Sequence, residues 1–482
     1  MNRPFMRLLI LLGGIEAKWD LFVRRAMLKT MENKKLFEEI PPSRAVMLLA
    51  LPTILSSLVM VLYNLADTYF VGLLNDPVQS AAVTLAAPVL LAFNAVNNLL
   101  GIGTSSVMSR ALGKDDYETV KNSASVGFYG ALCCGGILAL LCAVSGEAGL
   151  RILGAEAETM DATSAYLKWA VIFGAVPSIL SAVMAYLVRA EGASLHASIG
   201  SMSGCLLNIL LDPFFVLPRW LGLGAAGAGL ATFLSNCIAC CYFFALLKYT
   251  PTHICIRPSH VQIKWPVVID ICRIGIPAAI QNLLNVVGMT VLNRFTSNYG
   301  ADAVAAMGIA QRVHLVPFYI ALGGAQGVMP LISYNFSQGN TGRMRDSIRF
   351  GMRMAVCFMT TVAVGYGLGA RWLMAAFIDR GTVISYGAAF LRGLCLALPF
   401  LGIDFFAVGI FQACGMGRES LIFAVFRKVL LEIPLLYLLN RLYPLYGLPY
   451  AQVLTEIILS AATLRTIARL FKKNYSPNEH IL

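Results

Sequence analysis

The chain has 482 residues, of which 58% are hydrophobic and only 13% are charged. A soluble domain carries roughly 25% charged residues, so this sequence lacks the charge to cover a water-exposed surface. Its apolar content also excludes a disordered or fibrous chain. The composition predicts an all-α membrane protein, with room for about twelve spans.

The net charge of +12 is distributed in a way that indicates membrane topology. Lys and Arg gather in residues 1–44 and then in alternate connections between apolar runs, which is the positive-inside pattern. We therefore expect a multi-pass protein of the cell membrane with both ends cytoplasmic and an even number of spans. Basic residues are not interleaved with aromatic ones, so no nucleic-acid partner is expected.

Residues 1–44 are expected to form a cytoplasmic N-terminal segment. Residues 6–12 are apolar but too short to cross a membrane, and no small-residue cleavage site follows them, which argues against a signal peptide. The charged stretch from Met31 is a more natural beginning, so Met31 is the expected initiator.

Apolar runs separated by polar breaks predict twelve spans. Their expected limits are residues 45–73, 80–110, 121–147, 162–190, 194–217, 222–248, 266–298, 302–334, 345–369, 384–413, 419–440 and 446–471. The basic break at 249–265 is expected to be a cytoplasmic linker between an N-lobe (45–248) and a C-lobe (266–471), with a cytoplasmic tail at 472–482.

The two halves resemble each other at a nearly constant offset. Pro52 and Pro277 are 225 residues apart, and Gly192 and Gly415 are 223 apart. Because each half holds an even number of spans, the two repeats run parallel, as in one class of transporters. The sequence thus predicts two pseudo-symmetric six-helix lobes around a central cleft that rocking could open to either side.

Ionisable residues inside spans are energetically costly and are therefore functional candidates. In the first span, Asn64 and Asp67 share a helical face. In the fifth, Asn208 and Asp212 lie one turn apart, and Pro213 frees a backbone carbonyl. A carboxyl, a carboxamide and a freed carbonyl offer oxygen atoms to a cation, so these residues predict a cation site.

The second half offers other polar candidates. Asp404 is surrounded by apolar residues and is expected to be a counter-charge for a substrate. Gln281, Asn282 and Asn285 suit the polar wall of a substrate cavity, although hydrogen bonds between helices are an alternative role.

Arg312 and Arg427 lie inside apolar runs and are expected to be structural, pairing with carbonyls or acids. Glu432 is a candidate partner for Arg427, although five residues is a poor separation for pairing along one helix. Pro52, Pro213 and Pro277 are likewise expected to be structural.

The sequence lacks HExxH, Walker and GxSxG motifs. We therefore expect no enzyme, no metal site and no cofactor other than a transported coupling ion.

Several segments together resemble the multidrug and toxic compound extrusion (MATE) family, near its DinF-like branch. They include YNLADTYFVG at 63–72, GIGTSSVMSRALG at 101–113, RAEG at 189–192, AMGIAQR at 306–312 and FQACG at 411–415. The resemblance covers residues 31–472 and implies twelve helices and cation-coupled export of drugs or metabolites.

Residue by residue, the resemblance implies a cation site at Asp67, Asn208 and Asp212, with Thr232 supplying an oxygen from the sixth helix. Tyr63 and Asn64 are expected to line the substrate cavity. The acidic residue that another branch carries in helix seven is absent here, where Gln281, Asn282 and Asn285 occupy that stretch.

The expected function is antiport, in which H⁺ or Na⁺ drives the export of an organic, cationic and amphipathic compound. The alternative is a lipid-precursor flippase, which would need a basic cleft formed by Arg312, Arg427 and Arg189. We expect a monomer in the lipid bilayer, with small molecules as its substrates.

Overall fold

The computed structural model describes residues 33–250, 252–256 and 264–472. The expected start at Met31 and the tail beyond Lys472 lie outside these residues. Every regular element in the described part of the chain is helical, as the composition predicts.

The helices of the first half follow a short helix α2 (Asn33–Glu38). They are α3 (Pro42–Gly72), α4 (Pro77–Asn97), the π-helix η1 (Asn98–Ile102), α5 (Gly103–Gly113), α6 (Tyr117–Ile152), α7 (Met160–Leu167), the π-helix η2 (Lys168–Phe173), α8 (Ala175–Ala190), α9 (Ser194–Val216) and α10 (Ala225–Tyr249).

The second half repeats this order after the linker. Its helices are α11 (Trp265–Ser297), α12 (Ala301–Gln338), α13 (Thr341–Ala375), α14 (Gly381–Leu396), α15 (Leu398–Ala413), α16 (Gly417–Val425), the π-helix η4 (Phe426–Glu432), α17 (Ile433–Leu442) and α18 (Leu448–Lys472).

Of the twelve predicted spans, ten are long and apolar enough to cross a membrane in the described part of the chain. Eight qualify by length and apolar composition, and two more are helix pairs bent by 47° (η2 to α8) and 48° (α14 to α15). The remaining two, α16–η4–α17 and α18, carry more ionisable residues, several of them buried. The helix limits agree with those of the predicted spans to within a few residues, with the largest difference at the end of α13.

Short polar residues begin several of these helices. Asp76 accepts a hydrogen bond from the Val78 N–H at 2.9 Å, and Asp116 accepts one from the Thr119 N–H at 3.0 Å. Such side-chain caps satisfy N–H groups that have no partner inside the helix. The connections that precede these capped helices are very short, so consecutive helices run antiparallel.

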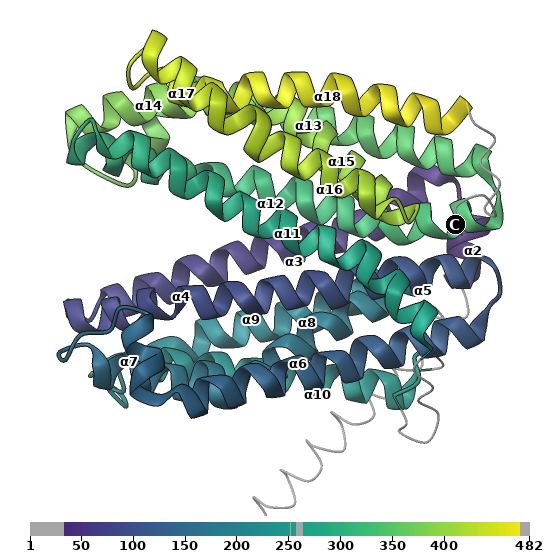
Figure 1. Cartoon of the computed structure of the whole chain (residues 1–482), viewed down its shortest axis with the longest axis horizontal. Coiled ribbons are helices and arrows are strands. Elements are labelled where there is room, and N and C mark those ends of the chain that lie inside the picture. Colours follow the sequence, from purple (N-terminus) through teal and green to yellow (C-terminus); the bar gives the residue numbers. More distant parts are fainter. Residues whose placement is uncertain (1–32, 251, 257–263, 473–482) are drawn as a thin grey trace, which may run out of the picture.

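The helices form two layers, α3–α10 (the N-lobe) and α11–α18 (the C-lobe), as Figure 1 shows. We call the end that carries α2, the start of α3 and the last turn of α18 the α2 end, and the opposite end the α7 end (Figure 1). The first helix of each half contacts the other half: α3 packs against α12, and α11 packs against η1 and α5. The two lobes are therefore joined by a reciprocal pair of contacts.

Glycines allow these inter-lobe contacts to be close. A Cβ added at Gly327 of α12 would lie 2.7 Å from the Leu49 carbonyl oxygen of α3, and one added at Gly103 of α5 would overlap the Ile271 carbonyl of α11. All four residues lie in the half of their helical segment nearer the α2 end. The lobes thus meet backbone to backbone at that end.

Helix α2 is attached to the C-lobe although it precedes the first N-lobe helix. Arg343 of α13 donates hydrogen bonds to the carbonyl oxygens of Leu36 (3.1 Å), Phe37 (2.5 Å) and Ile40. Glu38 accepts from the Tyr334 hydroxyl at 2.6 Å. The segment before α3 therefore bridges the two lobes at the α2 end.

Candidate functional site

Helix α3 carries the first predicted candidates near its C-terminal end, at the α7 end of the bundle. Asp67 and Tyr63 are half-buried, whereas Asn64 is exposed. The Asn64 amide donates to the Met60 carbonyl of its own helix at 2.9 Å. Pro52, one of the predicted structural prolines, lies within α3, which continues through it as one helix.

Helix α9 contributes the most deeply buried pair. Asn208 is 2% exposed and Asp212 is 0% exposed. In the amide orientation that satisfies both of its ends, Asn208 donates to the Asp212 carboxyl at 3.0 Å and accepts from the Thr232 hydroxyl at 3.1 Å. The one-turn spacing read from the sequence thus produces a hydrogen-bonded chain that reaches from α9 to α10.

The two aspartates lie close enough for their charges to repel each other. Tyr166 of α7 is 4% exposed and lies near both carboxyl groups, and Tyr63 lies near the Thr232 side chain. The structure therefore brings Asp67, Asn208, Asp212, Thr232 and Tyr63 together. We call these residues, with Tyr166, the N-lobe cluster.

Tyr166 was missed by the sequence analysis. It occurs in an apolar span that contains other aromatic residues. The sequence around a tyrosine does not reveal whether its side chain lies near a carboxyl group or in lipid. Its position near the start of span four, at the same end as Asp67 and Asp212, is the one signal that the sequence offers.

The amide side chains predicted for a cavity wall lie on α11. Gln281, Asn282 and Asn285 are all half-buried, and Pro277, one turn earlier on the same helix, is buried. None of the contacts described above for the N-lobe cluster involves these residues. They belong to the C-lobe side of the molecule.

The prediction that Arg427 pairs with an acid is confirmed, but the candidate partner is wrong. Arg427 pairs with Glu456 of α18 rather than with Glu432, with 2.8 Å between Nε and Oε1. Glu432 instead binds Lys428, one turn earlier in the π-helix η4. Arg312 is exposed on α12, and its expected structural role stays a prediction.

Asp404 of α15 is 2% exposed and faces α18. The Ser460 and Thr463 hydroxyls donate to its two carboxyl oxygens, each at 3.3 Å. Asp404 is therefore held inside the C-lobe by hydrogen bonds. Among the residues that the structure describes, no group of three or more His, Cys, Asp or Glu side chains could hold a metal ion.

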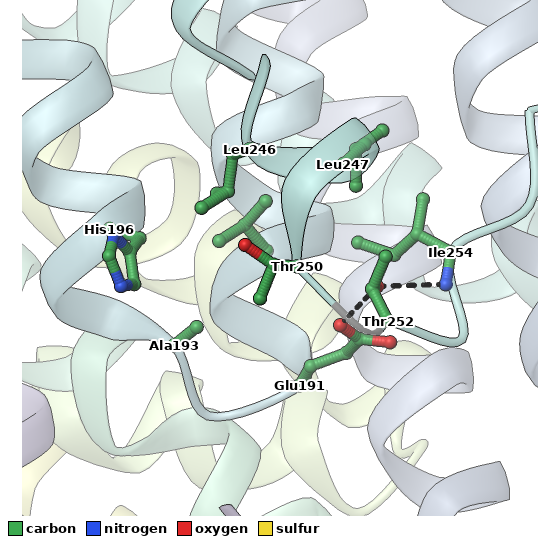
Figure 2. Close-up of a pocket in the computed structure, with 9 residues that line it drawn as sticks. Glu191, Ala193, His196, Leu246, Leu247, Thr250, Thr252 and Ile254 are labelled. Atoms are coloured by element: carbon green, nitrogen blue, oxygen red, sulfur yellow. Dashed lines mark hydrogen bonds between the residues drawn. The ribbon is translucent and has the colours of Figure 1, made fainter. Parts of the chain in front are cut away.

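A small pocket lies where the linker leaves α10, and Figure 2 shows its lining. The Glu191 carboxylate accepts from the Thr252 hydroxyl at 2.6 Å and from the His253 N–H at 2.8 Å. Thr252 in turn accepts from the Ile254 N–H at 3.0 Å (Figure 2). Burial raises the pKa of Glu191 to about 7, against the opposing effect of these hydrogen bonds.

The first residues of the linker therefore belong to the N-lobe. Two side chains of α6 add to the Glu191 contacts: Ser125 donates to the Cys255 carbonyl at 2.8 Å, and Tyr129 donates to the Ile256 carbonyl at 2.7 Å. Sequence reasoning assigned no function to Glu191, although it belongs to the RAEG segment that carries part of the resemblance.

Known proteins were compared with this chain. Residues 52–214 and 277–438 each match the model of the MatE family. The two matched segments begin at Pro52 and Pro277, the pair that reveals the internal repeat. The multidrug export protein MepA of Staphylococcus aureus is 31% identical over 434 residues, covering 89% of this chain and 94% of that protein. MepA of Staphylococcus saprophyticus is 31% identical over 430 residues, with the same coverage.

Solved structures agree with these relatives. An outward-facing multidrug resistance MATE family transporter of the MOP superfamily superposes with a TM-score of 0.86 at 25% identity, covering 91% of this chain and 98% of that one. A MOP superfamily transporter from Pyrococcus furiosus gives a TM-score of 0.83 with the same identity and coverage. The chain is therefore a multi-pass membrane transporter, not an enzyme, and it belongs to the MATE family of multidrug transporters.

Proposed function

We propose that this protein is a cation-coupled antiporter of the cell membrane that exports organic, cationic and amphipathic compounds. H⁺ or Na⁺ enters the N-lobe cluster from outside, and its binding drives the substrate outward by alternating access. The observation that carries the proposal is the approach of two carboxyl groups, Asp67 and Asp212, from separate helices. Such a pair is held apart by repulsion unless a cation or a proton occupies it.

The neighbouring oxygen atoms suit a small cation. Asn208 and Thr232 connect the Asp212 carboxyl to α10, and two tyrosines, Tyr63 and Tyr166, lie nearby. When the cluster is filled, α3 is drawn toward α9; when it is empty, repulsion favours separation. Since α3 also packs against α12, a movement of α3 couples the N-lobe cluster to the inter-lobe contact. One charge crossing 100 mV releases roughly 2.3 kcal/mol.

The orientation follows from the charge pattern. Lys and Arg residues of the connections between spans gather at the α2 end, so the α2 end is cytoplasmic. Glycine contacts close the lobes at that end. Closure at the cytoplasmic end is what an outward-facing state requires, and one similar transporter structure is described as outward-facing.

Two arginines that a flippase would need are already engaged. Arg427 is bound by Glu456, and the Arg189 guanidinium lies 5.3 Å from the ring centre of Tyr186. Of the three arginines that the flippase alternative would need, only Arg312 is exposed. A phosphate-binding cleft would need several accessible cations, so these contacts favour the antiporter over the flippase.

The test is efflux from proteoliposomes, with a pH gradient and a Na⁺ gradient imposed separately. Asp67→Asn and Asp212→Asn should each abolish ion-driven efflux and drug resistance while expression is retained. Asp161→Asn is the matched control, because Asp161 is exposed at the same end of the bundle. Efflux that is unchanged in both aspartate variants would refute the proposed site.

A further inference from the structure

Two equivalent turns of the internal repeat lie at the α2 end. Gly192 connects α8 to α9 in the N-lobe, and Gly415, 223 residues later, connects α15 to α16 in the C-lobe. Both residues have a positive φ, 86° and 77°, which side chains other than glycine rarely allow. A side chain that packs on either turn therefore meets bare backbone.

The turn at Gly415 is covered by the opposite lobe directly. A Cβ added at Gly415 would lie 2.6 Å from Nη1 of Arg110, which belongs to α5. The Ser106 hydroxyl, one turn earlier on α5, donates to the Gln412 carbonyl at the end of α15 at 2.5 Å. A helix of the N-lobe thus closes on this C-lobe turn with its own side chains.

The turn at Gly192 is covered by α2 instead. A Cβ added at Gly192 would lie 2.8 Å from Cζ of Phe37. The Phe37 side chain is 2% exposed, and its ring stacks on Tyr334 of α12, with 4.8 Å between ring centres and 21° between planes. In Figure 1, α2 lies where the two layers meet. The Phe37 ring therefore fills the space between a turn of the N-lobe and a helix of the C-lobe.

The two sides of α2 are held by different kinds of contact. Its hydrogen bonds go to the C-lobe: Arg343 binds its backbone carbonyls, and Glu38 accepts from the Tyr334 hydroxyl at 2.6 Å and from the Gln338 amide at 3.0 Å. Its contact with Gly192 is apolar. Separation of an apolar contact leaves no hydrogen-bonding group unpaired, whereas a broken hydrogen bond can leave a buried partner unsatisfied. The surface between Phe37 and the N-lobe is therefore the side that can part.

We propose that α2 is a latch that holds the lobes closed at the α2 end, with the Phe37 ring as the part that engages the N-lobe. Rocking that parts the lobes at this end withdraws the ring from the Gly192 turn, while α2 stays hydrogen-bonded to the C-lobe. The withdrawn ring loses part of its burial, so the latch adds to the free energy of opening. The latch rests on the proposed alternating access, but not on the identity of the coupling ion.

Distances between spin labels on the full-length protein in nanodiscs test the latch. The labels replace Lys114 and Arg418, which are exposed at the α2 end in different lobes, in a cysteine-free background. Phe37→Ala removes the ring but keeps the backbone carbonyls that Arg343 binds. The ratio of the long-distance to the short-distance population should rise about tenfold or more, as expected for the lost burial of a phenylalanine ring.

Two further variants of α2 complete the series. Phe37→Leu keeps an apolar side chain and should raise the same ratio by a smaller factor, which preserves the test if Phe37→Ala does not fold. Lys35→Ala is the matched control, because Lys35 is exposed on the same short helix. It should leave the distance distribution as in the wild type. An equal rise in Lys35→Ala and Phe37→Ala would overturn the latch.

Gly103→Val separates a failure of the latch from a failure of alternating access. Its side chain would overlap the Ile271 carbonyl of the opposite lobe, so it should force the α2 end open without touching α2. If Gly103→Val lengthens the distance and the Phe37 variants do not, the latch is refuted while alternating access stands. If no variant lengthens it, the α2 end does not open and both proposals fail.

Discussion

Gly275 of α11 lies directly against the backbone of Leu99 in η1, so the two lobes touch there without any intervening side chain. A Cβ added to Gly275 would overlap the Leu99 carbonyl oxygen. Gly327 of α12 makes the corresponding close approach to Leu49 of α3. Both contacts lie toward the α2 end, so closure of that end depends on positions that lack a side chain.

Gly275→Val should therefore shift the protein toward a state that is open at the α2 end. The valine side chain cannot fit against a backbone carbonyl, which has no freedom to move aside as a flexible side chain would. Spin labels at Lys114 and Arg418, in a cysteine-free background, should report a longer inter-lobe distance. Both positions are exposed at the α2 end and belong to different lobes.

Gly365→Val is the matched control for this substitution. Gly365 also lies within a helix, α13, but a Cβ there would meet no atom within 4 Å. The control should leave the Lys114–Arg418 distance distribution as in the wild type. If Gly275→Val also leaves it unchanged, the close backbone contact does not control closure.

Thr232→Val should weaken ion coupling, because it keeps the shape of the side chain but removes the hydroxyl that Asn208 accepts from. Leaving a buried polar group without its partner costs about 1–3 kcal/mol, which corresponds to a loss of ion affinity between about fivefold and about 150-fold if the cost falls on the ion-bound state. Efflux measured against the concentration of the driving ion should show this as a higher half-saturating concentration.

Thr232→Ser separates the hydroxyl from the methyl group in the same assay. It retains the oxygen, so its half-saturating ion concentration should stay close to the wild-type value. Equal losses in the serine and valine variants would show that packing by the methyl group matters, and the hydrogen bond would then have no role in coupling.

Hydropathy alone predicted the spans well, since each is a long apolar run that must satisfy its backbone hydrogen bonds internally. The same local reasoning predicted that Asn208 and Asp212 would interact, because their contact lies within one helix. Comparison of the two halves of the sequence also identified the internal repeat. Pro52 and Pro277, one pair of repeated residues, stand at the start of the two family matches.

Contacts between helices were beyond that reasoning. The partner of Arg427 is Glu456, 29 residues away on another helix, whereas the sequence could offer only a nearby glutamate. Tyr166 gained its significance in the same way, from neighbours brought by packing. The π-helix η4, which carries Arg427 and Glu432, has no spacing signal that would separate it from an ordinary helix.

Arg343→Ala should release α2 from the C-lobe. A single guanidinium holds the carbonyl oxygens of Leu36, Phe37 and Ile40, and alanine leaves all three without this donor. Hydrogen–deuterium exchange of residues 33–40 should become faster. Arg343→Lys should be intermediate, because an ammonium group lacks the planar fork that reaches several acceptors at once.

Arg349→Ala provides the control for this measurement, since Arg349 lies on the same helix and is exposed. Like Arg343→Ala, it removes one positive charge, but it does not remove a hydrogen bond to α2. Similar exchange in the two alanine variants would mean that overall charge, rather than the three hydrogen bonds, holds α2 in place.

Glu191 should make the stability of the protein depend on pH. Burial raises the pKa of this carboxyl to about 7 from an ordinary 4.5, so the folded protein holds the proton more tightly than the unfolded chain. The resulting stabilisation is fully present below about pH 4.5 and is lost as the pH rises through about 7. A shift of this size corresponds to at most about 3 kcal/mol.

Glu191→Gln isolates this contribution, because the amide does not titrate and its oxygen can still accept from the His253 N–H, while its NH2 group can donate to the Thr252 hydroxyl. Burial and Lys121 lower the pKa of His253, which makes stability fall toward acid pH by the opposite sign. That effect is common to both proteins and cancels in the difference between them. The Tm of the wild type minus that of Glu191→Gln should therefore decrease between about pH 5 and about pH 8. A difference that is constant over this range would show that Glu191 keeps one protonation state, so that its hold on residues 252–253 does not depend on pH.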